Sequence, residues 1–101
     1  MEITFNKWID AMSKNFRIST QHKKNNLEVN LEGDFDGTSA FELINIIKDY
    51  GANFYQIFID TNDLRTIYAF GRNVLQKNFG DLEKLSNLIF IGENERHLAQ
   101  T

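Results

Sequence analysis

The 101-residue sequence predicts a single α/β domain, residues 1–101, in which helices pack mainly on one side of a mixed β-sheet. Two observations predict this class. Early in the chain, two runs alternate apolar with polar residues, as in half-buried strands. Later, stripes with helical spacing alternate with short, almost wholly apolar runs, as in strands covered on both faces. The chain is 42% hydrophobic and 25% charged, which is typical of a folded domain.

Residues 1–14 are predicted to form an N-terminal helical extension of this domain. Phe5, Trp8, Ile9 and Met12 fall on one face of a helix, and the hydroxyl of Thr4 can cap its first turn. Two interpretations of this apolar stripe stay open. It packs on the protein's own sheet, or it forms an interface with a partner or with a second copy of the chain.

A β-hairpin is predicted next. Apolar and polar residues alternate over residues 16–20 and again over residues 27–31, and residues 23–26 between them are polar and tolerate turn conformations. The basic cluster at residues 22–24 falls in this turn, where a solvated loop is expected. The net charge of −3 also argues against binding of nucleic acid.

The first core helix is expected after residues 33–37, which break the strand. Ser39 and Glu42 have the spacing of a capping box, and Gly51 is suited to end the helix. Its apolar stripe consists of Ala40, Leu43, Ile44 and Ile47.

A second helix and two further strands complete the predicted order. Residues 55–60 form a buried strand that ends at Asp60, followed by a loop over residues 61–63. A helix begins near Thr66 and ends near Gly80, with an apolar stripe of Ile67, Phe70, Val74 and Leu75. A short buried strand over residues 88–91 and a terminal helix over residues 93–100 close the domain.

Two motifs resemble those of a known family. The letters LEGDFD at residues 31–36, followed by Ala40 and Leu43, resemble the L-x-G-E-L-D…A…L signature of STAS domains, which include the bacterial anti-sigma factor antagonists. The letters IFID at residues 57–60, followed by Leu64, Ile67 and Gly71, can be laid without a gap on the family's V-L-D-L…L…I-D-S-S-G. The resemblance spans residues 16–91. It implies a STAS-like fold and a cytoplasmic, non-catalytic protein-interaction module of bacterial regulation, whose partner is a kinase-like anti-sigma factor or a related regulator.

The chain departs from the family at one position. The resemblance implies a phosphorylatable serine just before Gly71, but Phe70 stands there and no serine occurs between residues 61 and 84. We therefore expect the fold to carry over without the serine phosphoswitch.

We expect the partner-binding surface at one end of the sheet, where two strands end and the helices that follow them begin. The residues expected there are Asp36, Asp60, Thr66, Tyr68 and Phe70. For Phe70 two interpretations stay open: it belongs to the apolar stripe of its helix, or it is an exposed aromatic anchor for a partner.

Residues typical of catalysis or metal binding are sparse. His22 and His97 have no evident carboxylate partner in the sequence, cysteine is absent, and Asp60 with Asp63 supplies only part of a metal site. We therefore expect no enzyme activity, no metal and no cofactor. No apolar run approaches the roughly 20 residues of a membrane span, and no signal peptide is recognisable, so a cytoplasmic location is expected. The alternative function is a small-ligand or nucleotide-binding sensor, with a weak site beside Asp36 and Asp60.

Overall fold

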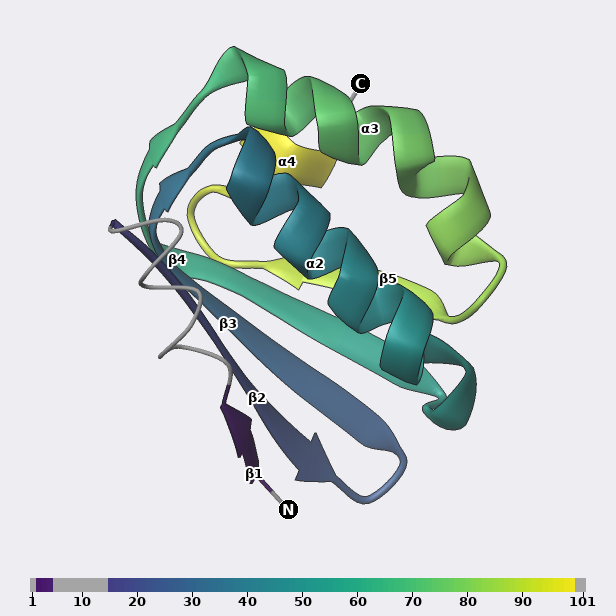
Figure 1. Cartoon of the computed structure of the whole chain (residues 1–101). Coiled ribbons are helices and arrows are strands. Elements are labelled where there is room, and N and C mark those ends of the chain that lie inside the picture. The colour runs from purple at the N-terminus through teal and green to yellow at the C-terminus, as the bar shows by residue number, and fades with distance from the viewer. Residues whose placement is uncertain (1, 5–14, 100–101) are drawn as a thin grey trace.

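The structure, a computed structural model, describes residues 2–4 and 15–99 (Figure 1). Five strands form one sheet in the order β1-β2-β3-β4-β5. In chain order, the elements are β1 Glu2–Thr4, β2 Phe16–Lys23, β3 Asn26–Phe35, α2 Gly37–Tyr50, a 3₁₀ turn Gly51–Asn53, β4 Gln56–Ile67, α3 Ala69–Glu83, β5 Asn87–Ile91 and α4 Glu95–Ala99.

The sheet is mixed, as the sequence predicts. Strands β1, β2 and β3 pair antiparallel, whereas β3, β4 and β5 pair parallel. The parallel pairs require crossover connections, which α2 and α3 supply, and α2, α3 and α4 lie on one side of the sheet (Figure 1). The predicted fold class of a mixed sheet with helices mainly on one side is confirmed.

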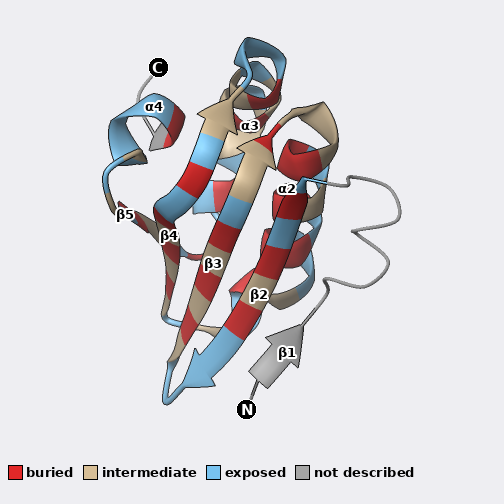
Figure 2. Cartoon of the chain, turned by 90° about the vertical axis from the view of Figure 1, so that its left-hand side faces the viewer, coloured by how far each residue is buried: buried red, intermediate tan, exposed pale blue. Residues whose placement is uncertain are grey.

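The predicted hairpin is also confirmed, with longer strands and a shorter turn. Strands β2 and β3 pair from Phe16 opposite Gly33 to Lys23 opposite Asn26. The turn consists of Lys24 and Asn25, and Lys24 has a φ of 53°. Every second residue is buried over residues 16–20 of β2 and 27–31 of β3, and Figure 2 shows this banding.

The hydrophobic core lies between the sheet and the helices. The four residues of the predicted first helical stripe are buried, as are the inward-facing apolar residues of β2, β3 and β4. Leu98 of α4 is also fully buried, so the short terminal helix closes one end of the same core.

Strand β4 differs most from the sequence prediction. It runs from Gln56 to Ile67, so the predicted loop over residues 61–63 is wrong. Asp60 pairs with Asn30 but Asp63 pairs with Glu32, and a second register shift follows near Leu64. Each shift places an extra residue in β4, and such bulges interrupt the alternation by which a strand is recognised in the sequence.

Several element boundaries differ for local reasons. Strand β3 continues through Gly33, which adopts a positive φ of 98°, and ends at Phe35. Helix α3 starts at Ala69 because Thr66 and Ile67 still pair with β3. It continues past Gly80 to Glu83, since a helix interior tolerates one exposed glycine.

The N-terminal prediction is partly corrected. Glu2–Thr4, the start of the predicted helical extension, is a strand that pairs with β2. The stripe residues Phe5 to Met12 lie outside the described residues. The helix over them and an oligomer formed through it stay predictions.

Candidate functional site

The starts of α2 and α3 lie together at one end of the sheet. Strand β3 ends at Phe35 and β4 at Ile67, and these two residues pair with each other. The backbone N–H of Tyr68 donates to the carbonyl oxygen of Phe35 at 2.9 Å. This hydrogen bond joins the two strand ends immediately before their helices, which start side by side (Figure 1).

The start of α2 is capped by its own side chains. Oδ1 of Asp36 accepts hydrogen bonds from the backbone N–H of Ser39 at 2.9 Å and from the Ser39 hydroxyl at 3.0 Å. Ser39 is fully buried. Asp36 is therefore the N-cap, and the predicted capping box of Ser39 with Glu42 is wrong, because the helix begins three residues earlier than that box requires.

The start of α3 has no such arrangement. Tyr68 occupies the N-cap position, makes no side-chain capping hydrogen bond, and is followed by no acidic residue in the first turn. Two aromatic side chains project there instead: Tyr68 is 51% exposed and Phe70 is 67% exposed. Phe70 is therefore exposed and not part of the buried stripe of α3, and its role as an anchor for a partner stays a prediction.

The Phe70 ring nevertheless rests against a defined neighbour. A Cβ atom added at Gly37 would lie 2.6 Å from Cδ2 of Phe70, so the ring contacts the first residue of α2. The ring therefore spans the starts of both helices. The sequence carried no signal for this contact, because Gly37 and Phe70 belong to different elements.

Gly71 brings the two helix starts together at the backbone. A Cβ atom at this position would lie 2.6 Å from the carbonyl oxygen of Asp36 and 2.9 Å from that of Phe35. Only glycine fits such an approach without moving the backbone. The glycine of the family-like motif thus has a packing role in this chain.

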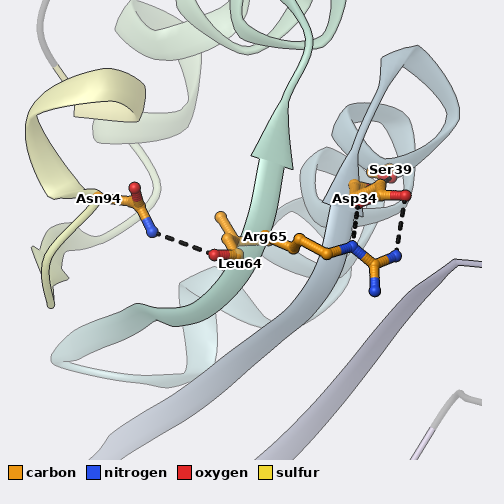
Figure 3. Close-up of polar contacts among 5 residues, drawn as sticks. All are labelled: Asp34, Ser39, Leu64, Arg65 and Asn94. Carbon is orange, nitrogen blue, oxygen red and sulfur yellow. Dashed lines mark hydrogen bonds and ion pairs between the residues drawn. The ribbon is translucent and has the colours of Figure 1, made fainter.

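An ion pair joins β3 and β4 close to the ends of both strands, just before the helix starts. The Arg65 guanidinium donates from Nε and Nη2 to the two carboxylate oxygens of Asp34, both at 3.0 Å (Figure 3). These hydrogen bonds, the charge of Arg65 and a hydrogen bond from Thr66 hold the pKa of Asp34 below its usual value. Thr66, one of the predicted site residues, is half-buried beside this pair.

Asp60 does not lie with the other predicted site residues. It pairs with Asn30 on one side and Ile91 on the other, in the middle of the sheet, and β4 continues to Ile67 beyond it. The predicted convergence of Asp36, Asp60 and Phe70 is therefore wrong for Asp60. The site prediction also missed Gly37 and Arg65; Arg65 follows the β4 bulge, where alternation does not indicate which face a side chain takes.

The histidines and the other possible metal ligands of the described residues are scattered over the fold. The ring Nε2 of His22 donates to the carbonyl oxygen of Lys24 at 2.7 Å, and His97 is exposed on α4. Within residues 2–4 and 15–99, no group of three or more His, Asp or Glu side chains is placed to hold a metal ion. In the same part of the chain, no helix is long and apolar enough to cross a membrane.

Known proteins resemble this chain in structure. No protein-family profile and no curated protein sequence matches it. An anti-sigma factor antagonist from Mycobacterium paratuberculosis is similar with a TM-score of 0.66 and 16% identity, over 86% of this chain and 80% of that chain. An antisigma-factor antagonist STAS domain from Rhodobacter sphaeroides gives a TM-score of 0.64 and 14% identity, over 80% of this chain and 90% of that chain.

Two further structures extend the comparison. The anti-sigma factor antagonist SpoIIAA in its unphosphorylated form gives a TM-score of 0.58 and 14% identity, over 84% of this chain and 81% of that chain. The protein Mglu gives a TM-score of 0.65 and 11% identity over 73% of this chain, which spans only 19% of the length of Mglu. At these identities the similarity concerns the fold, and the chain has the STAS fold of anti-sigma factor antagonists, as the sequence predicts.

Proposed function

We propose that this chain is a non-catalytic protein-interaction module of bacterial regulation, which binds a kinase-like anti-sigma factor or a related regulator without a serine phosphoswitch. The binding surface is formed by Tyr68 and Phe70 at the start of α3, with Asp36 and Thr66 beside them. One observation carries the proposal. An aromatic ring that is 67% exposed occupies the position at which the family carries its phosphorylatable serine.

An exposed phenylalanine at this position is suited to anchor a protein partner. Apolar rings left in water contribute nothing to folding, whereas burial of such a ring in an interface stabilises a complex, and aromatic residues are enriched at binding hot spots. The contact with Gly37 limits the positions open to the Phe70 ring, which reduces the entropy lost when a partner covers it. Tyr68 adds a second half-exposed ring two residues away.

The phosphoswitch is replaced by a permanent contact in this proposal. A phosphate would add up to about two negative charges at the start of α3 and would change docking when a kinase acts. A phenylalanine side chain accepts no phosphate, so phosphorylation at this position cannot change the affinity for the partner.

The test is a substitution at Phe70 with a matched control at Tyr55. Tyr55 is 68% exposed, and it precedes β4, whereas Phe70 follows the other end of that strand. A partner is first isolated from native lysate and identified by mass spectrometry. Its affinity is then measured by titration calorimetry for the wild type, Phe70→Ser and Tyr55→Ser.

We expect Phe70→Ser to weaken binding at least about tenfold, the effect of a modest hot spot, and Tyr55→Ser to leave it unchanged. Thermal melts of the three proteins separate lost binding from lost folding. Equal affinities for the wild type and Phe70→Ser would place the interface elsewhere. A tenfold loss in both variants would indicate a general effect of aromatic removal and would also contradict the proposal.

A further inference from the structure

The sheet has a second surface that the proposed function does not use. Helices α2, α3 and α4 cover one face, and within the described residues no helix lies over the other (Figure 1). Along β2, β3 and β4, less buried residues lie between the buried ones (Figure 2), and strand alternation places their side chains on the uncovered face. A hollow of about 250 Å³ lies there, over the middle of four strands, and we refer to it as the sheet-face hollow.

Strand register places the side chains of the hollow in two neighbouring rows. In the first row, Ser19 is opposite Asn30, Asn30 opposite Asp60, and Asp60 opposite Ile91. In the second row, Gln21 is opposite Glu28 and Glu28 is opposite Phe58. Because side chains in such rows stand about 5 Å apart, these seven residues form one continuous surface.

The two sides of this surface differ in chemistry. The β4–β5 side provides an apolar floor of Phe58 and Ile91, while the β2–β3 side provides hydroxyl and amide groups. Phe58 has two carboxylates as neighbours on its own face: Glu28 across the strand pair and Asp60 two residues further along β4. The described residues that line the hollow include these two carboxylates and no cationic side chain.

Each of the two carboxylates already has one partner within the protein. Nζ of Lys23 lies 3.4 Å from Oε1 of Glu28, and both side chains are about half exposed, so solvent screens this pair. Oδ1 of Asp60 accepts a hydrogen bond from the backbone N–H of Asn62 at 2.9 Å, which fixes its orientation. A carboxylate has room for further donors beyond one such bond, so Asp60 retains the capacity to bind a cation.

We propose that the sheet-face hollow binds a small organic cation, an ammonium group joined to an apolar body. The apolar body lies on Phe58 and Ile91. The ammonium group lies between the carboxylates of Glu28 and Asp60 and near the Phe58 ring, whose face attracts cations within about 6 Å. Charge complementarity selects this class over nucleotides and other phosphate compounds, because phosphate oxygens would face two carboxylates, of which Glu28 has one exposed lysine, Lys23, beside it.

The proposal is independent of the protein-interaction surface at the start of α3, which lies on the helix side of the sheet. Its test uses the full chain without any partner. Amide chemical shifts are followed by NMR while 2-phenylethylammonium is added at neutral pH. Parallel titrations use 2-phenylethanol, its neutral counterpart, and 3-phenylpropanoate, an anion of similar size.

We expect saturable shifts at residues 19–21, 28–30, 58–60 and 91 with the ammonium probe, at a dissociation constant of about millimolar, as suits a shallow site. The alcohol should bind at least about fivefold more weakly, and the acid should produce no saturable shift. Equal binding of ammonium and alcohol would overturn the proposal, since the carboxylates would then play no part. Shifts confined to other regions of the chain would overturn it as well.

Variants test the two carboxylates directly. Glu28→Gln together with Asp60→Asn removes both charges with little change of shape, and we expect at least tenfold weaker binding of the ammonium probe. The matched control is Glu32→Gln, which removes one carboxylate from the same strand, outside the lining of the hollow. This control should bind as the wild type does. Unchanged binding in the double variant would refute the assignment, and the three-probe comparison on the wild type stands even if that variant unfolds.

Discussion

The starts of α2 and α3 lie side by side but are constructed in opposite ways. At the start of α2, Asp36 and the buried Ser39 satisfy each other and the backbone of the first turn. At the start of α3, no side chain caps the helix, and Tyr68 and Phe70 face solvent. Polar groups that are hydrogen-bonded within the fold contribute to stability and have little capacity left for a partner. Exposed aromatic rings contribute little to stability but are suited to bind a partner. We therefore expect the start of α2 to contribute to stability, and the start of α3 is the one that we propose as the binding surface.

The largest expected effect comes from Gly71, where the start of α3 packs against the backbone that precedes α2. Gly71→Ala would force a Cβ atom to within 2.6 Å of the Asp36 carbonyl oxygen, so the backbone must shift. We expect the free energy of unfolding to fall by about 2–3 kcal/mol, measured by urea denaturation. The matched control is Gly80→Ala in the same helix, where an added Cβ atom would meet no atom of another part of the fold within 4 Å. This variant should raise stability by about 0.5–1 kcal/mol. Similar results for both variants would contradict the close contact.

The second prediction concerns the N-cap of α2 alone. Asp36→Ala removes the side-chain acceptor for Ser39, and we expect a loss of about 1–2 kcal/mol in the free energy of unfolding. Asp36→Asn keeps an acceptor oxygen and should lose much less. A stability loss below about 0.3 kcal/mol would show that the cap contributes nothing to α2.

The third prediction concerns the ion pair that joins the two strand ends. Hydrogen bonds from Arg65 keep the pKa of Asp34 below its usual value of about 3.9. A depressed pKa in the folded state stabilises the protein above the unfolded pKa, and this contribution is lost as the pH falls toward the folded value. Urea unfolding of the wild type and Arg65→Gln should therefore differ at pH 7 and converge as the pH is lowered below about 4. A difference that stays constant from pH 7 to pH 3 would exclude the pair as its cause.

The smallest expected effect comes from Gly37, which is compared with Gly71 at the neighbouring helix start. A Cβ atom at Gly37 meets the Phe70 ring, a mobile side-chain end, whereas one at Gly71 meets backbone. Gly37→Ala should therefore change stability by no more than about 0.5 kcal/mol, because the exposed ring can rotate away. The aromatic NMR signals of Phe70 should nevertheless shift. Unchanged signals would mean that the ring does not rest on Gly37.

Periodicity in the sequence was sufficient to determine which faces are buried. The alternation in β2 and β3 and the stripe of α2 depend on each residue's own preference for core or solvent, and the residues so identified are buried. The order of strands and helices then restricts the topology, because parallel neighbours need crossover helices on the sheet. The fold class follows from such local patterns, whereas both helices begin at other residues than the sequence predicts.

Strand ends and side-chain neighbours were decided only by the tertiary structure. Strand β4 continues past Asp60 because β3 offers it pairing partners up to Phe35, and its bulges hide this continuation from any local pattern. Asp60 therefore lies in the middle of the sheet, beside Phe58, and not at the helix starts. Phe70 lies on the surface because Gly71 brings α3 against the backbone of Asp36 in an orientation that leaves its first turn uncovered. Both outcomes depend on contacts between segments about 30 residues apart, and local preference alone does not specify such contacts.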